Sequence, residues 1–414
     1  MTDMAGTVPV IAVDKVQAVA LAVCTYYFGV WLKGKVGVLS RYSIPSPVVG
    51  GMSFAIVVSF LEYFNVVKVQ IDSTLQTVLM LGFFTTIGLM ASLRVVKDGG
   101  RLLLGFLLAV TVLVFLQNGM GMAIAEAMGF DKHYGILAGS VSMMGGLGTA
   151  AAFGPYFEET YGITGGTAVA VTAATFGMVA ALLIGGPFGE WCIRRYKVKT
   201  PDEVQQPEPE LHLPDDMDTD ITEQHASEKP SFTNEIMRAV SVTALAMGLG
   251  TIVSNYLGHY ITLPAYIGAM IVATVIRNVG DFSGMYKVEG KGLNAVADIT
   301  LVLFVTMAIN NLKLHELVHL ALPLVVILAC QTILMLIYAW TVLFTAFGRS
   351  YDAVMLSVGG IGFSMGATAN GLANMQAISE KYGSSPRAWL IVSVVGAFLI
   401  DLINAVVITW FGTL

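Results

Sequence analysis

Charged residues are scarce in this chain of 414 residues. Asp, Glu, Lys and Arg together make up 12% of the sequence, whereas hydrophobic residues make up 56% and the mean hydropathy is +0.74. Soluble domains carry about 25% charged residues. The composition therefore excludes a soluble globular protein, and the formal net charge of −6 argues against a nucleic-acid-binding surface.

Cysteine is scarce as well. The three cysteines, Cys24, Cys192 and Cys330, lie within or at the end of apolar runs and have no CxxC spacing. One of three thiols stays unpaired in any disulfide scheme, and the spacing indicates no thiolate zinc site. We expect neither a disulfide framework nor a bound cofactor.

One short segment nevertheless matches a metal motif. His315-Glu316-Leu317-Val318-His319 fits HExxH, in which two histidines on one helix bind zinc and the glutamate acts as a base. Pro323 lacks the N–H that would bond to the His319 carbonyl, and no third-ligand motif is apparent nearby. We expect an interfacial helix start here, with no zinc at His315 or His319 and no enzyme activity. An intramembrane zinc protease is the enzyme alternative.

Long apolar runs are abundant. About 20 apolar residues are needed for a helix to cross the hydrocarbon layer. Such runs occur near residues 12–32, 46–64, 74–92, 102–127 and 167–193, and again near 236–257, 263–279, 293–311, 317–347 and 388–412. They predict an all-α membrane protein with ten transmembrane helices.

The two sets of runs are separated by an acidic segment. Of the 28 acidic residues, 11 lie between Asp202 and Glu235, together with five prolines. Such a composition buries too little apolar area to offset the entropy of an ordered chain. We expect a flexible linker over residues 200–234 between an N-terminal repeat, 1–199, and a C-terminal repeat, 235–414.

The distribution of basic residues predicts the orientation. With the N-terminus outside, 18 of the 22 Lys and Arg residues fall on the cytoplasmic side, and only Lys15, Lys68, Lys132 and Lys313 do not. Cytoplasmic loops are enriched in basic residues. Both termini are therefore expected to be periplasmic and the linker cytoplasmic.

The two halves resemble each other at offsets of 214 to 221 residues. The matches are Gln117 with Gln331, Gly-Gly-Leu-Gly at 145–148 with Gly-Gly-Ile-Gly at 359–362, Glu159-Thr160-Tyr161-Gly162 with Glu380-Lys381-Tyr382-Gly383, and Thr85 with Thr306. Because each half has an odd number of spans, the halves would have opposite orientations. Inverted repeats of this kind are typical of secondary transporters.

Two glycine-rich segments are the candidate binding site. Non-helical backbone at membrane depth is tolerated where it is buried in protein or lines a wet cavity. We expect re-entrant loops at about residues 135–155, entering from outside, and 353–376, entering from the cytoplasm, whose tips meet near the midplane. The predicted substrate-binding residues are Gly145, Gly146, Gly148, Thr149, Gly359, Gly360, Gly362, Ser364, Thr368, Asn370 and Asn374. Close helix packing by small residues is the alternative reading.

A lone carboxylate in the last span indicates an ion site. Asp401 lies in the middle of an apolar helix, where a charge requires a partner, and that helix has no Lys or Arg. A bound cation or a proton would compensate the charge, while a hydrogen bond to a neighbouring helix is the structural alternative. The predicted sodium-binding residues are Asp401, Asn404, Ser142, Thr86 and Thr306.

Seven stretches of the chain resemble the bacterial sodium/glutamate symporter family. They are residues 42–51, 83–89, 145–149, 174–177, 362–368, 373–378 and 395–405. The resemblance implies sodium-coupled uptake of L-glutamate across the inner membrane by ten spans with two re-entrant loops, as a homodimer with an elevator-type motion. Leu147 and Ala369 depart from the family pattern, which commonly has His and Pro there.

Several functions stay open beside this one. A carrier driven by protons, or one for aspartate, another dicarboxylate or another amino acid, would share these features. A passive channel is a further alternative.

Overall fold

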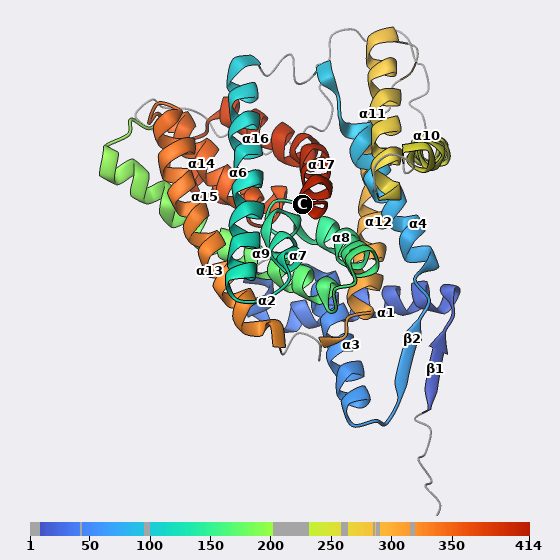
Figure 1. Cartoon of the computed structure of the whole chain (residues 1–414). Coiled ribbons are helices and arrows are strands. Elements are labelled where there is room, and N and C mark those ends of the chain that lie inside the picture. The colour runs from blue at the N-terminus through green and yellow to red at the C-terminus, as the bar shows by residue number, and fades with distance from the viewer. Residues whose placement is uncertain are drawn as a thin grey trace, which may run out of the picture.

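The computed structural model describes residues 9–41, 44–94, 100–201, 232–257, 264–284, 286, 290–314 and 319–414. Apart from one pair of short strands, the regular structure in these ranges is helical (Figure 1). The central part of the expected linker, residues 202–231, lies outside the described residues.

The N-terminal half contains a strand pair and the helices up to α9. Strands β1 (Val10–Val13) and β2 (Lys68–Ile71) pair in parallel. The helices are α1 (Lys15–Lys35), α2 (Gly37–Arg41), α3 (Ser46–Tyr63), α4 (Thr74–Met90), α6 (Gly100–Ala127), α7 (Lys132–Ile136), the π-helix η1 (Leu137–Val141), α8 (Gly146–Tyr161) and α9 (Gly166–Tyr196).

The C-terminal half follows a similar order. Its helices are α10 (Phe232–Leu257), α11 (Ala265–Ser283), α12 (Lys291–Asn310), α13 (Ala321–Tyr338) with the π-helix η4 (Ala339–Ala346), α14 (Tyr351–Ser364), α15 (Thr368–Tyr382), and α16 (Pro386–Val394) with η5 (Val395–Leu399) and α17 (Ile400–Gly412).

Eight helical stretches of the described chain are long and apolar enough to cross a membrane. They are Lys15–Lys35, Ser46–Tyr63, Gly100–Ala127, Gly166–Tyr196, Phe232–Tyr256, Lys291–Asn310, Ala321–Ala346 and Pro386–Gly412. The shorter apolar helix α4 and the helix α11 occupy the other two expected positions. The class of helical multi-pass membrane protein is confirmed, and the number of ten crossings stays a prediction.

The helices pack in two groups, and each group draws on both halves of the sequence. Helices α1, α3, α4, α10, α11 and α12 pack on one another and form what we call the six-helix group. Helices α6 to α9 and α13 to α17 form what we call the hairpin group, which occupies the left and centre of Figure 1. Contacts between the groups are fewer and involve mainly α8 with α12 and η5 with α4.

The six-helix group contains the one buried arginine of the described residues. The Arg277 Nε donates to Asp281 Oδ2 over 3.0 Å, and Ser92 Oγ donates to the same oxygen over 2.5 Å. The neighbouring Asn278 Oδ1 accepts from the Leu93 N–H at 2.8 Å. These bonds join the ends of α4 and α11, so the guanidinium of Arg277 is engaged inside the six-helix group.

Candidate functional site

The first glycine-rich segment is a helical hairpin. The His133 ring at the start of α7 stacks on the Tyr161 ring at the end of α8, with centroids 4.1 Å apart, so the two arms run in opposite directions. Gly139 interrupts the first arm with a non-helical backbone, φ −91° and ψ −130°. Residues 142–145 form the turn, and Gly146 follows with φ +63°, a conformation that suits glycine.

The second glycine-rich segment is also a hairpin, formed by α14 and α15. A Cβ atom placed on Gly362 would lie 2.2 Å from the Cα of Gly371, so the two arms approach more closely than any side chain would permit. Residues 365–367 connect the arms. The second arm of each hairpin therefore begins at its turn.

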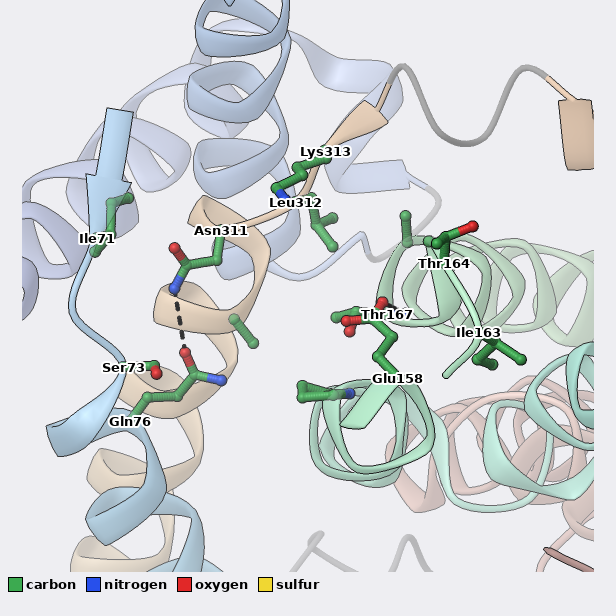
Figure 2. Close-up of a pocket in the computed structure, with 14 residues that line it drawn as sticks. Ile71, Ser73, Gln76, Glu158, Ile163, Thr164, Thr167, Asn311, Leu312 and Lys313 are labelled. Atoms are coloured by element: carbon green, nitrogen blue, oxygen red, sulfur yellow. Dashed lines mark hydrogen bonds between the residues drawn. The ribbon is translucent and has the colours of Figure 1, made fainter. Parts of the chain in front are cut away.

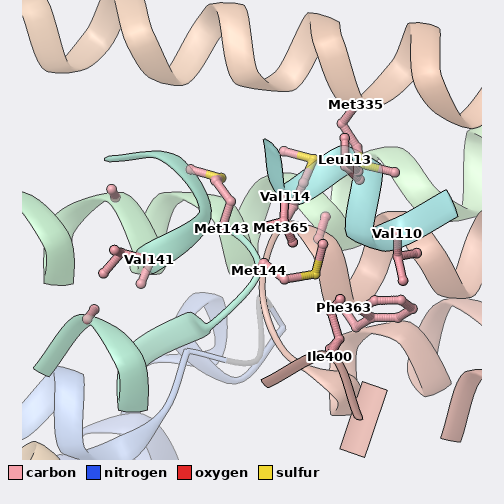
Figure 3. Close-up of a cluster of buried hydrophobic side chains, with 14 of the residues drawn as sticks. Val110, Leu113, Val114, Val141, Met143, Met144, Met335, Phe363, Met365 and Ile400 are labelled. Carbon is pink, nitrogen blue, oxygen red and sulfur yellow. The ribbon is translucent and has the colours of Figure 1, made fainter. Parts of the chain in front are cut away.

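The turns of the two hairpins touch. A Cβ atom placed on Gly146 would lie 2.5 Å from the carbonyl oxygen of Gly366. Behind this contact lies an apolar cluster that includes Met144 and Met365, one from each turn (Figure 3). The two segments thus converge within the hairpin group, as the sequence analysis expected.

The glycine motifs of the two halves do not occupy equivalent positions. Gly145 and Gly146 lie at the first turn, and Gly148 follows in the first turn of α8, facing the Phe83 ring of α4. Gly359, Gly360 and Gly362 instead lie inside α14, before the second turn. The motifs match at an offset of 214 residues, whereas the ends of the hairpins match at 221, so the residue that meets Gly146 is Gly366.

The three glycines of α14 serve close packing. A Cβ on Gly359 would meet Met375 Sδ at 2.7 Å, and one on Gly360 would meet a Leu343 methyl carbon at the same distance. The alternative reading of these positions as packing residues therefore describes their surroundings.

The predicted polar substrate residues lie at the second hairpin, with one at the first. Thr149 packs against Gly145, and Ser364 is fully buried at the end of α14. Thr368 Oγ1 donates to the Gly396 carbonyl over 2.5 Å. The amides of Asn370 and Asn374 hold α15 on α9, because their Nδ2 atoms donate to the Met178 and Ala181 carbonyls over 2.9 and 3.0 Å.

The predicted sodium residues separate into two sets. Asn404 Nδ2 donates to the Ser140 carbonyl over 3.0 Å, which places α17 against the first hairpin. Within the described part of the chain, no hydrogen bond or ion pair engages the Asp401 carboxylate, so the alternative of a structural bond to a neighbouring helix has no partner there.

The other three predicted sodium residues are engaged differently. Thr86 and Thr306 lie in the six-helix group, where their hydroxyls donate to carbonyls of their own helices over 2.7 and 2.6 Å. Ser142 does lie in the first turn, but its hydroxyl faces the Leu137 and Ala170 carbonyls at 2.5 and 2.7 Å. Tertiary structure thus brings Asp401 and Asn404 to the hairpin group and leaves the two threonines outside it.

Two adjacent residues of α6 connect the hairpins, and one of them was missed from the sequence. Gln117 Nε2 donates to the Ser364 carbonyl over 2.9 Å, while Asn118 Oδ1 accepts from the Ser140 N–H over 2.9 Å. Gln331 Nε2 adds a bond to the Gln117 carbonyl at 2.7 Å. Two consecutive amides in an apolar helix were the available signal, because buried amides require partners.

A cavity of about 370 Å³ lies between the two helix groups, away from the turns (Figure 2). Gln76, Asn311 and Lys313 line it from the six-helix group, and Thr164 and Thr167 line it from the hairpin group. The Asn311 Nδ2 donates to Gln76 Oε1 at 3.4 Å across the ends of α12 and α4. In the predicted orientation this cavity is on the periplasmic side.

The HExxH segment is described only in part. Residues 315–318 lie outside the described ranges, whereas His319 is described and exposed. No group of three His, Cys, Asp or Glu side chains suited to a metal ion occurs among the residues whose structure is described.

Paired helical hairpins that meet inside a polytopic bundle define the class of secondary transporters. The comparison with known proteins agrees. The model of the Sodium/glutamate symporter family matches residues 11–384. The chain is 38% identical to the sodium/glutamate symporter of Escherichia coli strain K12 over 95% of its length and 96% of the relative. It is 35% identical to that of Haemophilus influenzae over 94% and 95% of the two chains. The protein belongs to the sodium/glutamate symporter family and is a transporter, not an enzyme.

Proposed function

We propose that this protein carries L-glutamate across the bacterial inner membrane together with sodium. The supporting observation is the contact between the two hairpin turns, surrounded by buried polar atoms that lack partners. Both relatives named above are sodium/glutamate symporters, at 38% and 35% identity. The similarity extends over nearly the whole chain, so the site region is included.

Glutamate carboxylates would bind at the turns through the backbone. Helices α8 and α15 begin at Gly146 and Thr368, and the unpaired N–H groups at such helix starts attract anions. The two turns touch through Gly146 and Gly366, so both helix starts are directed to one region. Because Arg277 is engaged with Asp281, this arrangement accounts for anion recognition without a buried arginine.

The substrate ammonium group would bind to oxygen acceptors next to the turns. Gln117 Oε1 and Ser364 Oγ are buried and have no partner among the described residues, and a hydrogen bond from Gln117 Nε2 to the Ser364 carbonyl keeps them close. We include Thr149, Thr368, Asn370 and Asn374 in the substrate site, as predicted from the sequence.

We further propose an elevator-type motion in which the hairpin group moves relative to the six-helix group. Contacts between the groups are few, and at the level of the turns they are apolar. A Cβ on Gly148 would lie 3.0 Å from the Phe83 ring and 3.4 Å from a Leu301 methyl. Smooth apolar contacts with no hydrogen bonds to break favour sliding. The re-entrant placement of both hairpins, ten crossings, periplasmic termini and a homodimer belong to the same proposal.

Transport into proteoliposomes tests the function. We expect labelled glutamate to accumulate above its external concentration when sodium is high outside, and not when potassium or choline replaces sodium. Accumulation driven by a pH gradient alone would identify a proton-coupled carrier. Flux that only equilibrates glutamate would identify a channel. Competition by unlabelled aspartate and other dicarboxylates would define the substrate range.

A further inference from the structure

Six buried polar side chains form one hydrogen-bonded network around the hairpin turns, and each keeps one atom without a partner among the described residues. The unpaired atoms are Gln117 Oε1, Asn118 Nδ2, Ser140 Oγ, Gln331 Oε1, Ser364 Oγ and Asn404 Oδ1. All six side chains belong to residues at most 1% exposed. Native proteins pair nearly all such groups, so unpaired ones require an explanation.

The identity of the unpaired atoms follows from the backbone groups that the amides face. Asn404, Gln117 and Gln331 each face a carbonyl oxygen, so each must present its NH₂ group there and its oxygen remains free. Asn118 faces an N–H and therefore keeps a free NH₂ group. Five of the six unpaired atoms are consequently oxygens, which suits a cation better than an anion.

Ser140 and Asn404 hold two of these oxygens next to each other. The bond from Asn404 Nδ2 to the Ser140 carbonyl, 3.0 Å long, joins the two residues directly, and the Asn118 amide fixes the Ser140 N–H from the other side. Asp401 precedes Asn404 by three residues on α17, so both side chains lie on one face of that helix. An unpaired carboxylate, an amide oxygen and a hydroxyl are thus placed together.

We propose that the coupling sodium ion binds to Asp401, Asn404 Oδ1 and Ser140 Oγ, between α17 and the first hairpin. This inference rests on the proposed sodium coupling. The interrupted backbone at Gly139 lies beside the site, as in transporters where broken helices help to coordinate Na⁺. Thr86 and Thr306 are excluded, because they belong to the other helix group. Sodium bound here would fix the first hairpin and so prepare its turn for glutamate.

Sodium binding in the absence of glutamate tests this assignment. The thermal unfolding temperature of the purified protein in detergent is measured against NaCl concentration, with choline chloride keeping the ionic strength constant. A ligand that binds only the folded state raises this temperature. For Ser140→Ala and Asn404→Ala, we expect the NaCl concentration at half-maximal effect to rise about tenfold or more, since each loses a bond to a charged ligand.

Thr172→Val is the matched control, because the Thr172 hydroxyl in α9 is also unpartnered but has no bond to Ser140 or Asn404. It should keep the wild-type sodium response. Either folded variant suffices, since the two substitutions lie on different elements. Wild-type sodium affinity in a folded Ser140→Ala or Asn404→Ala protein would overturn the site. A wild-type protein without any sodium response, and without sodium-driven uptake, would instead refute the proposed function.

Discussion

Replacing Gly146 by alanine tests whether the contact between the two turns is required for transport. Gly146 has φ +63°, where an L-residue is disfavoured by about 1–2 kcal/mol. The new Cβ would also lie 2.5 Å from the Gly366 carbonyl oxygen, which is a backbone atom and can retreat only if a turn moves. Together we expect a cost of about 3 kcal/mol against the state in which the turns touch, equivalent to about a hundredfold lower population.

Two other glycines separate these effects. Gly162 has φ +70° but nothing within 4 Å of an added Cβ, so Gly162→Ala carries the backbone strain without the clash. Gly119 lies in α6 with open space around it and an ordinary backbone, so Gly119→Ala carries neither. Initial rates of sodium-driven glutamate uptake, corrected for the amount of reconstituted protein, are the measurement.

We expect Gly119→Ala to transport like the wild type, Gly162→Ala to lose stability but keep most of its uptake, and Gly146→Ala to lose about 99% of its uptake. Equal rates for Gly146→Ala and Gly162→Ala would show that the strain matters and the contact does not. In that case the proposed substrate site between the turns would have to be abandoned.

Three further predictions concern the ion, the second hairpin and the motion. Asp401→Asn should abolish the dependence of uptake on sodium concentration, and an unchanged dependence would remove Asp401 from the site. Asn374→Leu should lower the free energy of unfolding by about 1 kcal/mol through loss of its bond to Ala181, measured by thermal or denaturant unfolding, with no change expected if α15 is held otherwise. In a protein freed of its native cysteines, Gln76→Cys and Thr164→Cys, which face the cavity from the two helix groups, should be joined by bifunctional reagents. The joined protein should lose uptake; full uptake would contradict movement between the groups.

Several features of the site could be predicted from the sequence because they depend on local composition. The interrupted segments around Gly139 and Gly366 were recognisable as glycine-rich and uncharged stretches between apolar runs. The role of Asn404 beside Asp401 was indicated by two polar residues three positions apart in an apolar helix. Such signals survive in a single sequence because hydrocarbon tolerates broken backbone and buried charge only at special places.

Other residues were misjudged because their partners are distant in sequence. Thr86 and Thr306 have the composition of ion ligands, but their hydroxyls are used within α4 and α12. Asn118 was not selected, although its bond to Ser140 places the first hairpin. A hydroxyl in a helix looks the same in sequence whether it bonds its own carbonyl or waits for a ligand.

By itself, the sequence determined that this protein is a helical membrane transporter with a duplicated half, because apolar length and the sodium/glutamate symporter motifs are properties of the chain. Only the tertiary structure decided which residues meet. The motif match at an offset of 214 residues suggested that Gly359, Gly360 and Gly362 face the first turn, yet the fold brings Gly366 to Gly146. It also assembles the two helix groups from both halves, since packing joins surfaces in space and not segments in order.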